Sequence, residues 1–151
     1  AGGLDAIQER FSMIDRGIEK DLLPLTRANG ISTLSYSSLA LGLLSGTIPP
    51  DREFSGDDQR KGNPRFSVAN RNRVAGFAGA IRTVAGAHGA TIAQVVIAWT
   101  LAQPGITFAL CGARNPAQAQ DNACAGTIRL SPDELSAIDT AIASWLAVMD
   151  G

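Results

Sequence analysis

The stretch LCGARNPAQAQDN, residues 110–122, decides how the fold of this chain is interpreted. It follows the short apolar run ITFAL, residues 106–110, which predicts a buried strand. A Gly-Ala pair allows a tight turn off that strand. Asn115 and Pro116 are typical of the N-cap and first position of a helix. The stretch therefore predicts a helix that begins at the carboxyl end of a strand.

The beginning of that helix is a candidate anion site, because free N–H groups and the positive end of the helix dipole attract negative charge. Arg114 adds a planar cation suited to phosphate. Gln118, Asp121 and Asn122 follow helical spacing on one face, where they could hydrogen-bond an adenine or a ribose. A purely structural interpretation stays open: Asn115 and Gln118 also form an ordinary capping pair, and Asp121 and Asn122 would then face water.

Composition places the chain among ordinary soluble globular proteins. It has 151 residues, 45% hydrophobic and 18% charged, with a formal net charge of −1, so neither a nucleic-acid nor a membrane partner is expected. Cys111 and Cys124 are too few for a disulfide framework, which predicts reduced thiols and a cytoplasmic location. The first twenty residues contain no signal-like apolar run. The absence of an initial methionine fits a fragment of a longer protein.

Strand and helix patterns alternate along the chain. Strands are expected in three segments, helices in five and a long polar loop in one. The strands are 5–12, 31–38 and 106–110; the helices are 18–30, 70–89, 91–103, the one after 115 and one from the capping box SPDEL at 131–135; the loop is 47–68. This order predicts a parallel sheet covered by helices. Three strands leave at least one sheet edge open, so the architecture looks incomplete.

Polar side chains also follow the other two strands. Gln8 lies near the end of the first strand, and Tyr36 with its following serines ends the second. The carboxyl ends of parallel strands meet on one rim, as at the mouth of a barrel. There a tyrosine ring could stack on a flat cofactor ring and an amide could hold a carboxamide, although a single tyrosine is more often a core aromatic.

From about Leu4 to Ala143 the sequence resembles the C-terminal half of an aldo-keto reductase. The matching runs are IQERFSMIDRGIEKDLLPLTRANGI, YSSLALGLLSG, NPRF, GATIAQVVIAWTLAQPGIT, GARNPAQAQDNACA and LSPDELSAID. The resemblance implies an α/β fold that forms the last three strands, with their helices, of a (β/α)8 TIM barrel. Residues 1–151 would then be a partial barrel domain without its N-terminal half. It also implies an oxidoreductase that reduces aldehydes and ketones with NADP(H).

The resemblance assigns cofactor contacts to three groups of residues, and no metal. Gln8 would bond the nicotinamide carboxamide and Tyr36 would stack on its ring; Ser37, Leu39 and Gly42 would lie along the pyrophosphate; Gly112, Ala113, Arg114, Gln118, Asp121 and Asn122 would surround the 2′-phosphate and adenine. Three positions depart from the family pattern. Ser38 and Cys111 stand where proline is usual, which loosens two turns, and Asp121 replaces a longer glutamate.

The catalytic residues of the family are expected to be absent. Its chemistry uses a tyrosine acid with Lys, Asp and His partners from the N-terminal half, whereas Tyr36 occupies the stacking position. His88 is interpreted as a solvated turn residue. Cys111 could have a lowered pKa at a helix N-terminus, but an inert thiol is favoured. Without a proton donor for the carbonyl, the chain is predicted to be inactive alone.

Other functions remain open at this stage. The chain could be a non-catalytic nucleotide-binding module, or a half-barrel that pairs with a second copy or with a missing N-terminal half. In the reductase that the resemblance implies, a small carbonyl substrate would be bound through the missing N-terminal half. A helix-turn-helix protein is disfavoured, because the helix at 91–103 is apolar nearly all round and the net charge is close to zero.

Overall fold

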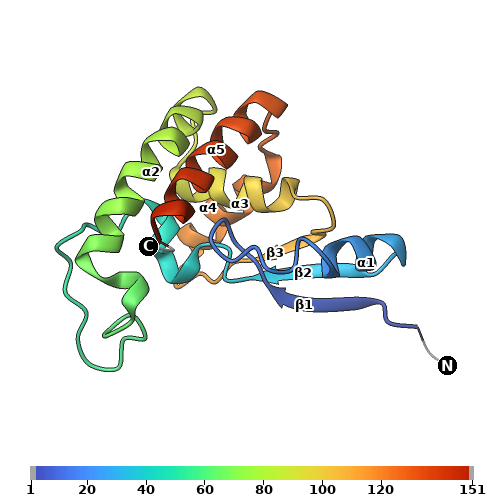
Figure 1. Ribbon diagram of the computed structural model, residues 1–151, viewed down its shortest axis with the longest axis horizontal. Coiled ribbons are helices and arrows are strands. Elements are labelled where there is room, and N and C mark those ends of the chain that lie inside the picture. The colour runs from blue at the N-terminus through green and yellow to red at the C-terminus, as the bar shows by residue number, and fades with distance from the viewer. Residues whose placement is uncertain (1–2, 150–151) are drawn as a thin grey trace.

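A computed structural model describes residues 3–149 and contains one sheet (Figure 1). Strands β1 (Ala6–Arg10), β2 (Ser32–Tyr36) and β3 (Phe108–Leu110) are parallel and adjacent in that order. β1 and β3 are therefore edge strands, and Figure 1 shows no further element beyond β1. The three predicted strands and their parallel pairing are confirmed, but the expected burial of the strand at 106–110 is wrong, because Phe108 and Leu110 of β3 are exposed.

Within residues 3–149, five α-helices and three short 3-10 helices connect and cover these strands. They are α1 (Leu22–Ala28), η1 (Ala40–Ser45), η2 (Pro64–Phe66), α2 (Val68–Ala87), α3 (Ile92–Ala102), α4 (Pro116–Cys124), η3 (Ala125–Thr127) and α5 (Pro132–Met149). The predicted order is confirmed, but α1 begins four residues later than expected. Residues before it form a turn, in which the Glu19 N–H donates to the Arg16 carbonyl and the two side chains form an ion pair of 2.7 Å.

The hydrophobic core lies between the sheet and the long helices. Residues Val95–Thr100 of α3 are all buried, and Trp99 stacks on Phe11 with ring centroids 6.0 Å apart. Ile138 and Ile142 bring α5 onto the same core. A helix buried along this length is a core element, as its apolar composition predicted.

The two faces of the sheet have different environments. On one face Thr33 and Ser35 are buried, and Thr33 Oγ1 donates to Thr26 Oγ1 of α1 over 3.1 Å. On the other face Tyr36, Phe108 and Leu110 are 41%, 54% and 39% exposed. Because side chains alternate along a strand, this second face of the sheet is largely open to solvent, with Leu34 on it partly buried.

Among the described residues, no single helix is long and apolar enough to cross a membrane. By length and composition alone, only α2 and α3 taken together pass that test, as a pair bent by 90°.

Candidate functional site

The register of the sheet brings Gln8 and Tyr36 to the same face. Gln8 pairs with Leu34, and Tyr36 lies two residues further along β2, so both project from the open face on neighbouring strands. Tyr36 pairs with Leu110 at the end of β3, next to the turn that leads into α4. The three strand ends therefore form one rim, as the sequence predicted.

The segment after β2 turns through an unusual backbone. Ser37, Ala40 and Leu41 have positive φ angles of 65°, 48° and 57°, and Gly42 has 89°. Left-handed conformations of non-glycine residues cost free energy and concentrate at ligand sites and switch regions. The segment is closed by hydrogen bonds from Ala40 N–H to Ser37 O, 2.7 Å, and from Gly42 N–H to Leu39 O, 2.9 Å. The expected pyrophosphate residues Ser37, Leu39 and Gly42 thus share one tight bend.

Ser38, which stands where the resemblance implies a proline, is buried within this bend. Its Oγ lies 3.5 Å from the Oγ of Ser35, which also donates to Phe108 O over 3.2 Å. The serine therefore adds a polar contact that proline could not make.

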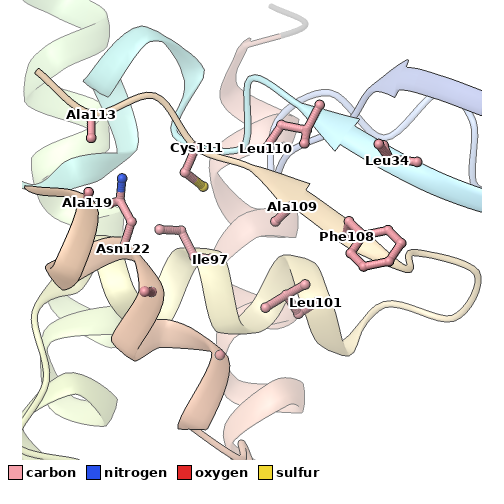
Figure 2. Close-up of a pocket in the computed structure, with 12 residues that line it drawn as sticks. Leu34, Ile97, Leu101, Phe108, Ala109, Leu110, Cys111, Ala113, Ala119 and Asn122 are labelled. Carbon is pink, nitrogen blue, oxygen red and sulfur yellow. The ribbon is translucent and has the colours of Figure 1, made fainter.

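The turn between β3 and α4 is exposed and is held by α4 side chains. Arg114 N–H donates to Gln118 Oε1 over 2.9 Å, and Asn122 Nδ2 donates to Gly112 O over 3.2 Å. Figure 2 shows the Asn122 amide directed toward the segment at Cys111–Ala113. Asn115 Oδ1 accepts the Gln118 N–H at 2.9 Å, so its predicted capping role is confirmed.

Asp121 departs from the expected arrangement. Its Oδ1 accepts a hydrogen bond of 2.8 Å from Gln94 Nε2 of α3, whereas Gln118 and Asn122 reach back to the turn at 112–114. The alternative in which Asp121 and Asn122 simply face water is wrong, since both side chains have protein partners.

An open apolar groove of about 600 Å³ runs along the free edge of β3, between that strand, α3 and α4 (Figure 2). Its apolar lining includes Leu34, Ile97, Leu101, Phe108 and Leu110, and Cys111 also lines it. Burial raises the pKa of the Cys111 thiol. The suggestion of a lowered pKa is therefore wrong, and the thiol is poorly ionised.

Ion pairs with Asp15 connect the long loop after η1 to the end of β1. The sequence analysis did not predict these ion pairs. Arg65 donates to both carboxylate oxygens of Asp15, at 2.9 and 2.7 Å, and Arg10 at the end of β1 lies 3.2 Å from the same carboxylate. Burial alone would raise the pKa of Asp15, but the hydrogen bonds and charge of Arg65, with Arg10 and Ser12, outweigh it and hold the pKa below its usual value.

The same loop is also held from inside by Arg71 of α2. This buried side chain donates through Nη1 to the carbonyls of Pro49 and Arg52, at 3.1 and 2.6 Å. Its guanidinium lies 5.4 Å from the ring of Phe54, which packs edge-on against Phe66. The predicted loop is therefore held at defined anchor points, although most of its residues are exposed.

His88 lies away from the rim, at the end of α2. Its Nε2 is 2.9 Å from Glu134 Oε1 at the beginning of α5. The side chain is thus a link between helices and not a simply solvated turn residue. The capping box of Ser131 and Glu134 is confirmed by hydrogen bonds in both directions.

Comparison with known proteins identifies this arrangement. The sequence profile described as the aldo/keto reductase family matches residues 3–143. The chain belongs to the aldo/keto reductase family. It is 36% identical over 130 residues to an NADH-specific methylglyoxal reductase of Escherichia coli, covering 86% of this chain and 39% of that protein. It is 33% identical over 118 residues to an aldo-keto reductase of Bacillus subtilis, covering 78% and 36%.

A solved structure agrees with this family. The glycerol dehydrogenase of Gluconobacter oxydans superposes with a TM-score of 0.84 at 29% identity, covering 92% of this aldo/keto reductase chain and 42% of the other. The present chain thus spans about two-fifths of the length of these relatives.

Proposed function

We propose that this aldo/keto reductase chain is the C-terminal part of a (β/α)8 barrel, comprising its last three strands and their helices, and that it supplies most of the cofactor site of an NADP(H)-dependent carbonyl reductase. Three features support the partial barrel: a parallel sheet with two free edges, an uncovered sheet face with exposed aromatic and apolar side chains, and an apolar groove beside β3. A further strand and helix along β3 would cover the groove, and closure of a barrel through both free edges would enclose the open face.

The observation that carries the cofactor proposal is the composition of the rim. An exposed tyrosine ring, a left-handed backbone bend and a helix N-terminus follow one another at the carboxyl ends of adjacent strands. A flat ring, a diphosphate and a terminal phosphate are the ligand groups that these features suit. Tyr36, the bend at 37–42 and the turn at 112–114 would contact the three parts of the dinucleotide in that order.

Arg114 is the basis for the proposed preference for NADP(H) over NAD(H). It is exposed beside the beginning of α4, and within residues 3–149 its guanidinium has no hydrogen-bond or ion-pair partner. A free guanidinium beside a helix N-terminus favours an additional phosphate group. Because the Escherichia coli relative is named NADH-specific, this preference needs a direct measurement.

The proposed reaction needs a proton donor that this part of the barrel does not supply. The reduced nicotinamide would deliver a hydride to a carbonyl carbon, and the oxygen must then receive a proton. Tyr36 is the only tyrosine of the chain and stands where ring stacking is proposed. We therefore propose that the chain binds cofactor but reduces no carbonyl until the rest of a barrel is present.

The proposal is tested by titrating the purified chain with NADPH and with NADH, following nucleotide fluorescence, and then adding an aldehyde. We expect saturable NADPH binding, weaker NADH binding and no aldehyde-dependent oxidation. Absence of saturable binding by either nucleotide would overturn the cofactor site. Steady aldehyde-dependent turnover would overturn the proposal that the chain is inactive alone.

A second candidate is a self-associating, non-catalytic nucleotide-binding module, favoured by the two free sheet edges. Light scattering during size-exclusion chromatography distinguishes this module from the partial reductase barrel. A stable stoichiometric oligomer that binds NADPH supports the module. The free Cys111 and Cys124 suit either protein in a reducing compartment such as the cytoplasm.

A further inference from the structure

Helix α4 has little apolar anchorage. None of its residues, Pro116–Cys124, is buried, whereas α3 beside it is buried along much of its length. The position of α4 matters, because its first turn and the turn before it form the phosphate end of the proposed cofactor site. Something other than apolar burial must therefore fix this helix against the rest of the molecule.

Gln94 provides a polar link of this kind. The side-chain Oε1 of Gln94 accepts a hydrogen bond of 2.9 Å from the backbone N–H of Thr91. The backbone N–H of Gln94 donates to Thr91 Oγ1 over 3.2 Å, which completes the capping box of α3. Its Nε2 points the other way and donates to both the carbonyl O and the Oδ1 of Asp121, at 3.0 and 2.8 Å. One half-buried amide thus joins the N-terminus of α3 to the middle of α4.

We infer that Gln94 is a positioning residue for the nucleotide phosphate site, and that Asp121 serves as its anchor on α4 and not as a cofactor ligand. The carboxylate and the carbonyl of Asp121 converge on a single N–H₂ group, which fixes both the rotation and the height of α4 on α3. Gln118 and Asn122, on the neighbouring positions of α4, then hold the turn at 112–114. This inference rests on the proposed function for its ligand, but the link itself is independent of it.

The substitution Gln94→Glu tests the link with almost no change of shape. The carboxylate can still accept the Thr91 N–H, so the cap of α3 is kept, but its second oxygen would face two acceptors of Asp121. Adding Asp121→Asn supplies a donor again and removes the like charge. Gln120→Glu is the matched control, since it makes the same change at an exposed position of α4.

We expect Gln94→Glu to weaken NADPH binding roughly three- to tenfold. Addition of Asp121→Asn should recover most of that loss, and the Gln120→Glu control should change the affinity less than twofold. The weakening by Gln94→Glu should also shrink as pH falls and the new carboxyl becomes protonated. If the second substitution weakens binding further, Asp121 touches the nucleotide and the inference is wrong. It is also wrong if Gln94→Glu leaves the affinity unchanged.

Amide hydrogen exchange across residues 116–124 measures the link without any nucleotide. Gln94→Glu should speed exchange throughout α4, and the double variant should slow it again, relative to unchanged exchange in α5. If the native chain binds neither nucleotide, the proposed function fails while this measurement still decides the link. Unchanged exchange in the Gln94→Glu variant would contradict the link even if NADPH binds.

Discussion

At the scale of single residues, the backbone after β2 carries conformations that most side chains avoid. Gly42 has a φ of +89°, and a methyl group at its Cα would meet only Ile48 Cδ1, at an ordinary 3.5 Å. Space therefore does not demand glycine here, but the backbone angle does. Neighbouring Ala40 and Leu41 also have positive φ angles, and the buried residues Leu43 and Leu44 follow them in η1.

We predict that Gly42→Ala lowers the free energy of unfolding by about 1 kcal/mol, because alanine resists a positive φ. Gly79→Ala is the matched control, since Gly79 is a helical residue of α2 with open space around it. That change should raise stability by about 0.5–1 kcal/mol. Urea unfolding followed by tryptophan fluorescence measures both, and equal effects of the same sign would contradict the role of the bend.

Arg114 is predicted to distinguish the two nucleotides. Arg114→Gln should weaken NADPH binding about tenfold, since a charged hydrogen bond to phosphate contributes about 1.5 kcal/mol or more, and should leave NADH binding nearly unchanged. Arg82→Gln, at an exposed position of α2, is the control. Fluorescence titration of each variant with both nucleotides provides the comparison. Equal losses for NADPH and NADH would show that Arg114 does not read the additional phosphate.

At the scale of elements, the loop between η1 and η2 is organised by its anchors. Asp15, between β1 and α1, accepts hydrogen bonds from Arg65 at the far end of the loop, and Arg71 donates to two loop carbonyls. The Asp15–Arg65 pair joins positions fifty residues apart in the chain, and the Arg71 contacts join positions 22 and 19 residues apart. They tie a loop of polar sequence to the turn after β1 and to α2.

We predict that Asp15→Asn lowers the free energy of unfolding by about 1 kcal/mol near neutral pH, since solvent screens part of this charge cluster. Because the pKa of Asp15 is lowered in the folded state, its contribution is complete well above the usual value of 3.8 and is lost as pH falls through the folded value. The difference between wild type and variant should therefore be constant from neutral pH to about pH 5 and shrink below it.

Urea unfolding at several pH values tests this expectation, with Asp57→Asn in the same loop as a control, because Asp57 is exposed. Trypsin should also cut the loop faster in the Asp15→Asn protein at neutral pH. A stability difference that grows on acidification, or equal cleavage of both variants, would contradict the anchor.

At the scale of the whole molecule, the helices bury one face of the sheet and leave the other open. The exposed Phe108 and Leu110 lie on this open face, at the edge strand β3 and beside the apolar groove. Contiguous apolar surface of this kind marks a surface that another chain or segment covers. The open face is therefore the expected origin of any association of the isolated chain.

We predict that Phe108→Ser reduces concentration-dependent association while changing the free energy of unfolding by less than about 0.5 kcal/mol, because Phe108 is already 54% exposed. The same substitution at buried Phe77, which packs against Trp145, should cost about 3 kcal/mol or more. Light scattering over a range of concentrations and urea unfolding measure these effects. Association unchanged by Phe108→Ser would assign it to another surface.

Local patterns by themselves determined the type and order of the strands and α-helices of this protein. Asn115 with Pro116 marked the beginning of α4, Ser131 with Glu134 that of α5, and alternating or buried apolar runs marked the strands, because capping and periodicity depend on near neighbours along the chain. Tertiary structure alone decided the partners of polar groups far apart in sequence. Gln94 with Asp121, Asp15 with Arg65 and His88 with Glu134 are brought together by helix packing and sheet register, which no local pattern encodes.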